Sequence, residues 1–390
     1  MISVSDAKKL VWKNTSHLDS ISIDLYSATE FTLTEDIHSP IQSPPFNQSA
    51  VDGYAYCFND SVNKLELIGE VPAGDSLKIN FSPNSCVRIF TGAQVPDCYD
   101  TVVMQEKVER NNNEININDP DQKKGMNIRL AGSQIQKGEL AVKKGKKINA
   151  AVAGYLAGLG IARVNIFKNP KVSIISTGNE LISPGTQLQP GKIFESNTYS
   201  LNAVLNEIGI IPTSIVKVKD DQQLIENAIQ KCLVESDIVI LSGGVSVGDY
   251  DFVASALTNC KVECIFHKVK QKPGKPLYFG KKDKTLFFGL PGNPAALLTC
   301  YYEYILPCIL KIRGEENKQK NLQLKLTNNY TKKPGLTHFV KGKIDGNEVT
   351  ILNSQESYLM NSFAQANCLV QLDEEKINFE KSDIVEVHPI

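Results

Sequence analysis

Three short glycine-containing segments each follow an apolar, strand-like run. They read STGNEL (176–181), SGGVSVGDYD (242–251) and LPGNP (290–294). Turns of this kind place backbone N–H groups, or the start of a helix, where an anion can bind. One such turn is usually only a turn, but three at one edge of a sheet predict a pocket. The residues expected to contact a ligand there are Ser176, Thr177, Gly178, Gly243, Gly244, Gly248, Gly292 and Asn293.

Several lysines lie between the second and third of these segments, and two of them belong to the sequence KPGKP that begins at Lys272. The prolines hold Lys272 and Lys275 on a stiff loop, and a rigid pair of ammonium groups suits a multiply charged anion. The alternative is a solvated strand edge protected by lysines. We prefer that alternative for three lysines further along, Lys281, Lys282 and Lys284.

Carboxylates stand beside the glycine turns, although carboxylates repel anions. Glu180 follows the first turn, and Asp249 and Asp251 follow the second. A cation between carboxylate and phosphate removes this conflict, and Mg²⁺ usually takes one or two carboxylates plus phosphate oxygens. We therefore expect Glu180, Asp249 and Asp251 to bind Mg²⁺, with Asp251 the strongest candidate. The alternative is that Asp249 or Asp251 caps the helix of YDFVASAL, and the two roles are compatible.

Two further motifs lie in the N-terminal part of the chain, PPFNQSAVDGYA (44–55) and RIFTGAQVP (88–96). By chemistry alone, Asp52 with Gly53 indicates a turn. Thr91 is then a hydroxyl group at the end of a strand. Neither motif by itself indicates a reaction.

The elements that must position the glycine turns alternate between strands and helices from 170 to 311. KVSIISTG, IPTSIVKV, DIVILSGG, VECIFHKV and TLFFGL are strands of nearly continuous apolar character. Helical periodicity separates several of them, and Asp221 is expected to cap the helix of DDQQLIENAIQKCLVES. This alternation predicts a parallel, doubly wound α/β sheet with its ligands at the carboxyl ends of the strands.

The remaining periodicity predicts a multidomain α/β protein with four parts. Helical patterns at 1–40 and 141–169 are assigned to one helical linker domain. The stretch between them, 41–140, is expected to be an inserted β-rich domain. The α/β domain occupies 170–313. Short alternating strands at 314–390, with a hairpin at Asp345-Gly346, predict a small C-terminal β-barrel or sandwich.

Composition excludes several classes of protein. The 390 residues include 42 Lys and Arg against 43 Asp and Glu, for a net charge of -1, which lacks the basic footprint of a nucleic-acid-binding protein. The N-terminus lacks the apolar core of a signal peptide, and the apolar stretch 150–162 is too short to span a bilayer. Nine cysteines without a CxxC pair indicate core residues in a reducing compartment, with a catalytic thiol as the alternative. We expect a cytoplasmic protein that binds neither nucleic acid nor membrane.

Taken in order, the motifs resemble those of the molybdopterin molybdenumtransferases, whose eukaryotic relatives include the E domain of gephyrin. The resemblance extends from about residue 4 to the C-terminus and includes PPFNQSAVDGYA, RIFTGAQVP, GMNIR, ISTGNEL, LSGGVSVGDYD, KPGKP and LPGNP. It implies insertion of molybdenum from molybdate into adenylylated molybdopterin, with release of AMP and with Mg²⁺ as cofactor. It also implies a homodimer with a shared active site, and a transient contact with the molybdopterin adenylyltransferase is a further expectation.

The resemblance also implies roles for particular residues. The α/β domain would be the molybdopterin-binding domain, and a partner chain would deliver Asp52 and Thr91 to its site. The residues implied to be catalytic are Asp52, Thr91, Glu180, Asp251, Lys268, Lys272 and Lys275. Those implied to bind substrate, beyond the turn residues above, are Ser246, Pro291, Pro294, Lys341 and Ser357.

Four positions depart from the family pattern. Asn179 and Gln134 stand where relatives often carry aspartate, which weakens a catalytic role for either. Ala296 replaces a common serine and removes one hydrogen bond to molybdate. Lys341 replaces a frequent arginine, so it keeps the charge but loses the bidentate fork.

Two other functions compete with this one. The first is a nucleotide pyrophosphatase of the competence-damage type, whose N-terminal domain has a similar STGNEL-like sheet; the β-rich insert argues against it. The second is a gephyrin-like scaffold without catalysis, which the acidic and lysine residues disfavour. The sequence leaves open a preference for molybdenum or tungsten.

Overall fold

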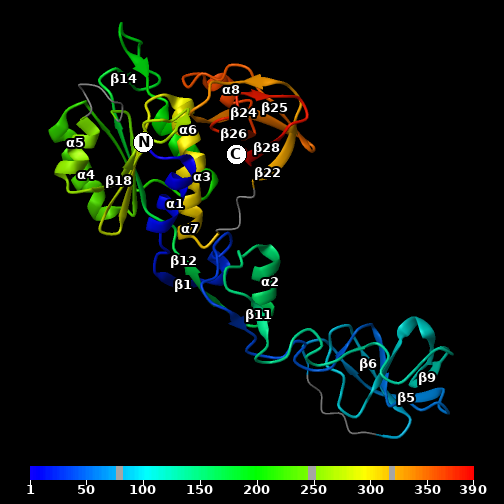
Figure 1. Cartoon of the computed structure of the whole chain (residues 1–390). Helices are drawn as coiled ribbons and strands as arrows, with labels where there is room; N and C mark the ends of the chain where they lie inside the picture. The colour runs from blue at the N-terminus through cyan, green and yellow to red at the C-terminus, as the bar shows by residue number, and fades with distance from the viewer. Residues whose placement is uncertain (76–81, 245–251, 316–320) are drawn as a thin grey trace. The chain divides into compact units, whose positions relative to one another are not determined.

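The computed structural model of the chain describes residues 1–75, 82–244, 252–315 and 321–390. They form two compact units, Met1–Ile21 with Phe167–Ile390 and, separately, Ser22–Ile166 (Figure 1). The chain passes from one unit to the other in β1 (Ser20–Asp24) and again in β12 (Arg163–Phe167). The finer division into four domains stays a prediction.

The larger unit contains a six-stranded sheet in the order β16-β13-β17-β21-β20-β18. The first four strands are parallel, as expected, but β20 and β18 are antiparallel to their neighbours, so the prediction of a parallel sheet is wrong at this edge. Only Asp283 and Lys284 connect β20 to β21, and so short a connection permits only antiparallel neighbours. The strands are β13 (Val172–Thr177), β16 (Ser214–Val218), β17 (Ile238–Ser242), β18 (Glu263–His267), β20 (Tyr278–Lys282) and β21 (Thr285–Leu290).

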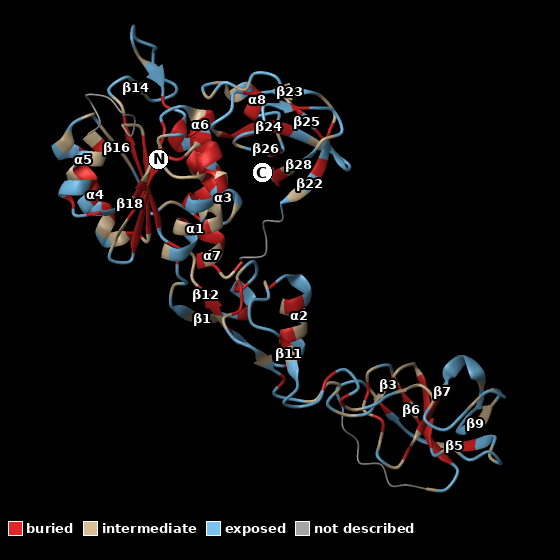
Figure 2. Ribbon diagram, in the orientation of Figure 1, coloured by how far each residue is buried: buried red, intermediate tan, exposed pale blue. Residues whose placement is uncertain are grey.

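Helices cover both faces of this sheet (Figures 1 and 2). Ile174 and Ile240 belong to the core on the side of α1, α3, α6 and α7, whereas their neighbours Ile175 and Leu241 pack on the side of α4 and α5. Adjacent residues of a strand point to opposite faces, so continuous apolar strands bury both faces of the sheet. The helices are α1 (Val4–Asn14), α3 (Asn197–Glu207), α4 (Gln222–Glu235), α5 (Phe252–Asn259), α6 (Pro294–Cys300) and α7 (Leu306–Ile312).

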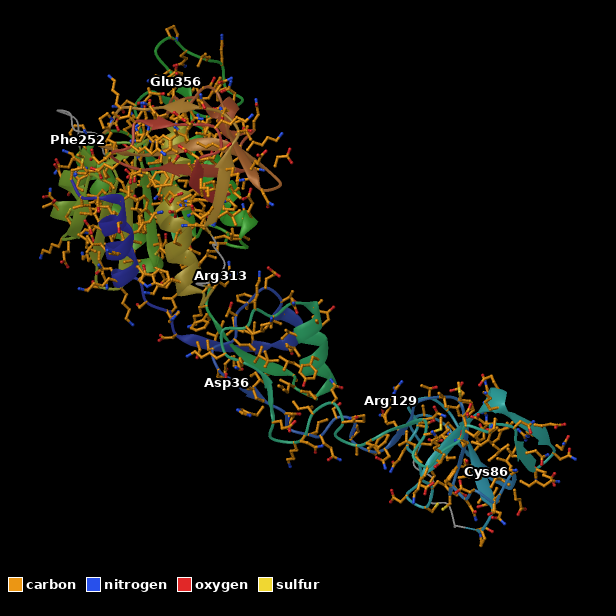
Figure 3. All side chains as sticks on the ribbon, turned by 45° about the vertical axis from the view of Figure 1, so that its right-hand side comes forward. Asp36, Cys86, Arg129, Phe252, Arg313 and Glu356 are labelled. Carbon is orange, nitrogen blue, oxygen red and sulfur yellow. The ribbon has the colours of Figure 1, made fainter. Side chains whose placement is uncertain are left out.

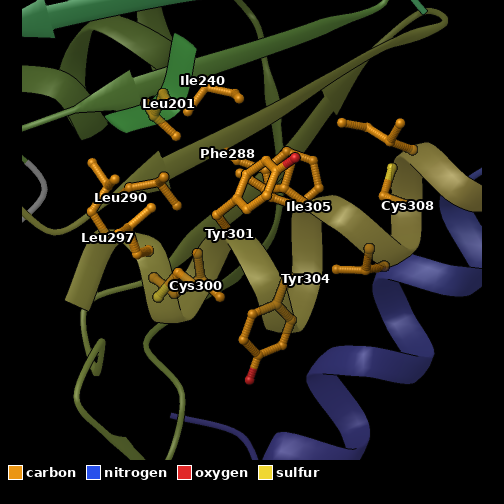
Figure 4. Close-up of a cluster of buried hydrophobic side chains, with 14 of the residues drawn as sticks. Leu201, Ile240, Phe288, Leu290, Leu297, Cys300, Tyr301, Tyr304, Ile305 and Cys308 are labelled. Carbon is orange, nitrogen blue, oxygen red and sulfur yellow. The ribbon is translucent and has the colours of Figure 1, made fainter. Parts of the chain in front are cut away.

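One helical run, Pro294–Ile312, joins α6, the π-helical segment η3 (Tyr301–Ile305) and α7 in the core of this unit (Figure 4). Among the described residues it is the one helix long and apolar enough to cross a membrane, and 78% of its apolar window is buried in the protein. Packing in the core accounts for that composition. α1 packs on η3 and α7 through an apolar stripe at Val4, Ala7 and Val11. Helix α1 therefore packs within the larger unit, and the assignment of residues 1–40 to a helical domain stays a prediction.

The C-terminal part of the same unit is a β-barrel closed by pairing of β24 with β26. Asp345 pairs with Glu348 at the end of the β24–β25 hairpin, which confirms the hairpin predicted at Asp345-Gly346. The segment 271–276, which contains KPGKP, is called the lysine loop here. Its short strand β19 (Gln271–Lys272) extends the barrel sheet in parallel to β24. The barrel elements are β22 (Leu322–Leu326), β23 (Tyr330–Thr331), β24 (Thr337–Asp345), β25 (Glu348–Ile351), α8 (Met360–Phe363), β26 (Cys368–Leu372), β27 (Asn378–Phe379) and β28 (Ile384–Pro389).

The smaller unit is mostly β-structure around the sheet β7-β4-β6-β5-β9-β8, with apolar clusters on both faces. Cys86 lies in its interior, fully buried (Figure 3), and burial raises the pKa of its thiol to about 12. Six of the nine cysteines are buried, as predicted for core residues. The sheet strands are β4 (Gly53–Tyr56), β5 (Lys64–Val71), β6 (Ser85–Ile89), β7 (Thr101–Met104), β8 (Val108–Asn111) and β9 (Glu114–Ile117).

The rest of the smaller unit contains one of the predicted helices. Among its described residues there is one α-helix, α2 (Ala150–Gly158), within the helical pattern at 141–169, where Asn149 caps the N-terminus by accepting from Val152 N. Two antiparallel strand pairs, β2 with β11 and β3 with β10, lie in the same unit, and β3 and β10 belong to the stretch 41–140 that was predicted to be β-rich. The remaining short elements of the chain are η1 (Leu25–Ser27), β2 (Ile37–His38), β3 (Gln48–Ser49), η2 (Gln105–Lys107), β10 (Ile128–Arg129), β11 (Leu140–Val142), β14 (Leu181–Ile182) and β15 (Ile193–Phe194).

Candidate active site

The three glycine turns meet at one edge of the α/β sheet, as predicted. β13, β17 and β21 are parallel neighbours, with Ser176 opposite Ser242 and Ser242 opposite Leu290. The carboxyl ends of parallel strands lie at the same edge, so the turns that follow them are adjacent.

A cavity of about 680 Å³ lies at this edge, between the glycine turns, the lysine loop and a loop of the barrel. It is large enough for a cofactor-sized ligand. The predicted residues in its lining are Thr177, Gly178, Glu180, Gly243, Gly244, Lys272, Lys275, Pro291, Gly292, Asn293 and Ser357. Ser246, Gly248, Asp249 and Asp251 lie outside the described residues.

Gly243 acts in this site through close packing between turns. Its φ is +91°, and a Cβ atom there would lie 2.3 Å from the carbonyl oxygen of Thr177. Its N–H donates to Leu290 O at 3.4 Å. The sequence pattern predicted that this N–H would face an anion; instead, the glycine allows the ends of β13, β17 and β21 to approach one another.

The sequence analysis missed several polar residues of the lining, among them Asn197, Asp220, Gln271 and Gln355. Asn197, at the start of α3, donates through Nδ2 to Ser242 Oγ and to Gly292 O, both at 2.9 Å, and so joins two of the turns. Asp220 accepts from Asn179 N at 2.9 Å and from the Thr177 hydroxyl, which fixes the first turn. The sequence signal that could have indicated Asp220 was its position directly before the predicted cap residue Asp221. The capping role of Asp221 is confirmed, because its side chain accepts a hydrogen bond from Leu224 N.

The lysine loop contributes Lys272 and Lys275 to the lining, whereas Lys268 is not part of it. His338 lies opposite Lys272 in the β19–β24 pair. Burial, followed by the positive charges of Lys332 and Lys272, lowers the pKa of His338 to about 4. His338 is therefore neutral at pH 7, and the lysines remain the cations at this end of the cavity.

Among the described residues, the acidic side chains of the lining are those of Glu180 and Asp220. Glu180 is exposed to the cavity, whereas Asp220 is occupied by the first turn. Among the described residues, no group of three or more His, Cys, Asp or Glu side chains is arranged to hold a metal ion. A Mg²⁺ site that uses one or two protein carboxylates and the phosphates of a substrate remains compatible with Glu180.

The barrel closes the cavity with the loop that carries Gln355 and Ser357. Asn293 Nδ2 donates to Ser357 Oγ at 2.9 Å, and Ala295 N donates to Ser357 O at 3.1 Å. These bonds attach the barrel loop to the third glycine turn. Ser357 therefore lies where the sequence analysis placed it.

Lys341 was predicted to bind substrate, but it lies outside the lining and is 3% exposed. Its ammonium group donates to the backbone oxygens of Ser354, Glu356 and Leu359, at 2.7, 3.3 and 3.2 Å. Burial lowers its pKa. Three carbonyl acceptors use the three donors of the ammonium group, so Lys341 shapes the loop on which Ser357 is carried (Figure 3 labels Glu356 in this loop).

Two other predicted contacts also lie outside the main lining. Pro294 is the first residue of α6. Ser176 borders a neighbouring cavity of about 460 Å³, because adjacent residues of β13 point in opposite directions. Ala296 does line the main cavity, so the position where a serine is common in the family presents a methyl group there.

Asp52 and Thr91 form a second polar site, in the smaller unit. Although 39 residues apart, they are joined by two 2.8 Å bonds, from Thr91 N and from Thr91 Oγ1, both to Asp52 Oδ1. The backbone bond, followed by the hydroxyl bond, lowers the pKa of Asp52. The sequence analysis named both residues but did not predict their contact.

Comparison with known families places this fold and site in a defined class. Residues 2–160 match the MoeA N-terminal region (domain I and II), residues 173–311 match a probable molybdopterin binding domain, and residues 323–390 match the MoeA C-terminal region (domain IV). The class is thus a multidomain protein whose α/β domain is of the molybdopterin-binding type.

Whole-chain relatives support a narrower assignment. The molybdopterin molybdenumtransferase of Haemophilus influenzae is 34% identical over 94% of this chain and 93% of its own length, and that of Nostoc is 37% identical over 80% and 75%. A solved structure of the moeA protein from Pyrococcus horikoshii, 30% identical, superposes with a TM-score of 0.87 over 100% of this chain and 99% of that one. The chain belongs to the molybdopterin molybdenumtransferase family.

Proposed function

We propose that the protein inserts molybdenum from molybdate into adenylylated molybdopterin, with release of AMP and with Mg²⁺ as cofactor. The observation that carries this proposal is the 680 Å³ cavity, which is lined by three glycine turns, by Lys272 and Lys275, and by the carboxylate of Glu180. Such a lining suits a substrate that carries both a pterin-sized group and a pyrophosphate.

In this proposal, Lys272 and Lys275 bind the molybdate oxyanion. Molybdate is a tetrahedral dianion, and the two ammonium groups come from one short loop between prolines. Asn293 and Ser357, joined by their own hydrogen bond, line the same cavity with an amide and a hydroxyl group. This end of the cavity therefore binds molybdate and brings it to the molybdopterin dithiolene.

Glu180 would hold Mg²⁺ together with Asp251 and Asp249, next to the first and second turns. An ion held there would neutralise the charge of the pyrophosphate, whose phosphoanhydride bond breaks when an oxygen nucleophile attacks phosphorus and AMP leaves. Asp220 keeps the first turn in place through Thr177 and Asn179, which holds Glu180 at the cavity.

A homodimer completes the site in this proposal. Half-buried Asp52 and exposed Thr91 are preassembled on the smaller unit, which suits delivery to the cavity of a partner chain. The substrate must come from an adenylyltransferase, so a transient contact with that enzyme in the cytoplasm is part of the same proposal. A pure pyrophosphatase or a scaffold would need neither the lysine pair nor the Asp52–Thr91 pair.

The test is AMP release from adenylylated molybdopterin by the purified protein, with and without molybdate and Mg²⁺. We expect release that depends on both, and loss of at least about 100-fold in Asp251→Asn. Asp283→Asn, in the turn between β20 and β21, is the matched control and should behave as wild type. Normal cofactor production by Asp251→Asn in a deletion strain would contradict the assigned mechanism, and ADP-ribose hydrolysis without molybdate-dependent AMP release would favour the pyrophosphatase.

A further inference from the structure

Gln271 is a polar residue at the base of the lysine loop, and it has no place in the function described so far. It is 0% exposed and directly precedes Lys272 in β19. A fully buried amide side chain persists only where its donors and acceptor are satisfied. Its partners therefore indicate what it holds.

Both ends of the Gln271 amide are bonded, and they connect two different elements. Nε2 donates to Pro273 O at 3.0 Å, inside the lysine loop. Oε1 accepts from the hydroxyl of Tyr304, which lies in η3 of the core helix and is 1% exposed. Tyr304 thus orients Gln271, and Gln271 in turn holds the carbonyl group between the two site lysines.

The loop packs directly on this amide. Gly274 has a φ of +88°, and a Cβ atom there would lie 2.7 Å from Gln271 Nε2 and 2.5 Å from Cys300 Sγ. Cys300, also fully buried, donates weakly to Gly274 O at 3.8 Å. The bend between Lys272 and Lys275 therefore packs directly against the core helix through Cys300.

We propose that Gln271, oriented by Tyr304, is a positioning residue that sets the separation and direction of the Lys272 and Lys275 ammonium groups for a tetrahedral oxyanion. The inference rests on the proposed function of these lysines. Without the amide, the carbonyl of Pro273 loses its buried donor, and the loop moves between several conformations. Two ammonium groups that move independently bind a dianion less tightly than two that are held in place.

The experiment compares Gln271→Leu and Tyr304→Phe with Tyr301→Phe. Tyr301 is the matched control, because it is 1% exposed on the same helical run and its hydroxyl donates to Val204 O at 3.1 Å, away from the loop. Both tyrosine variants lose one buried hydrogen bond, so a purely structural effect would be the same in both. Tyr304→Phe also keeps the test valid if Gln271→Leu fails to fold.

Two measurements on the full-length protein decide the question. Amide hydrogen exchange over residues 268–277 should be faster by about tenfold in Gln271→Leu and Tyr304→Phe and unchanged in Tyr301→Phe. The KM for molybdate should rise by about tenfold in the same two variants, with kcat changed by less than about twofold.

Unchanged exchange in the folded variants would overturn the inference, and so would faster exchange with an unchanged KM for molybdate. An equal rise of KM in Tyr301→Phe would show that the effect is general loss of stability. If the wild type itself releases no AMP in response to molybdate, the proposed function fails, whereas the exchange measurement still decides whether Gln271 holds the loop.

Discussion

The two units of the chain hold their polar site residues in different ways. In the larger unit, turns from three strands, the lysine loop and a barrel loop enclose one cavity, and buried groups such as Asn197 and Lys341 fix those loops. In the smaller unit, half-buried Asp52 and exposed Thr91 depend on each other for their geometry. In a packed site, a substitution at one residue shifts the neighbouring side chains. In a pair at the surface, the structural change stays at the two residues themselves.

The largest expected effect is in the enclosed site. Lys272→Ala removes one of two cations from the cavity and should lower kcat/KM for molybdate by about 100-fold. Lys284→Ala, an exposed lysine in the turn before β21, is the control and should be neutral. Steady-state kinetics with varied molybdate measures both. Equal effects of the two variants would mean that the lysine-rich stretch acts only as a charged surface.

The next prediction concerns stability and tests how tightly the glycine turns pack against each other. Gly243→Ala places a Cβ atom against Thr177 O and forces a strained φ, so the free energy of unfolding should fall by about 3 kcal/mol or more. Gly185→Ala has a similar φ of +87° but no atom within 4 Å, and should cost only about 1 kcal/mol. Urea titrations give both values. A small loss in Gly243→Ala would show that the turns are not tightly packed.

Mixed dimers test whether the two sites act together. Asp52→Ala and Asp251→Ala should each be inactive, but a co-expressed mixture should regain about a quarter of wild-type activity. Half of randomly assembled dimers are mixed, and each mixed dimer has one intact site. AMP release by the purified mixture measures the recovery. No recovery, although mixed dimers form, would contradict a site shared between chains.

The smallest effect should come from a substitution of Thr91, the hydrogen-bond partner of Asp52. Thr91→Val removes the hydroxyl bond to Asp52 but keeps the backbone bond, which is the larger cause of the lowered pKa. The pKa of Asp52 should therefore rise part of the way to its ordinary value. Because the carboxylate is then protonated at a higher pH, activity should be lost earlier as the pH falls.

Titration of the Asp52 carboxyl by NMR measures this shift directly. Thr91→Ser keeps the hydroxyl group and is the matched control. An unchanged pKa in Thr91→Val would show that the backbone N–H of residue 91 alone sets the charge of Asp52.

Local patterns were reliable where local chemistry decides the outcome. The glycine turns, the Asp221 cap and the Asp345-Gly346 hairpin were all read from a few adjacent residues. The antiparallel strand β20 was missed, because Tyr278–Lys282 was not among the predicted strands and the two-residue connection to β21 was therefore not recognised as a hairpin turn.

Residue roles were harder to predict when they depended on distant partners. Lys341 resembled a ligand contact, yet its three donors are used by carbonyl groups of its own barrel. Asn197 and Gln271 carried no motif, yet each links two segments that line the cavity. Nothing in the local sequence shows which carbonyl group a buried amide will meet.

The sequence by itself determined the family, the alternation of strands and helices, and the residues able to bind an anion or a cation. Those depend on residue type and on spacing along the chain, which are already present in the unfolded polymer. The tertiary structure decided which of them share a cavity, which lysines line it and at which glycine a Cβ atom would clash with a neighbouring strand end. Those depend on contacts between residues far apart in the chain, because only packing brings such groups within hydrogen-bond distance and makes an unpaired one costly.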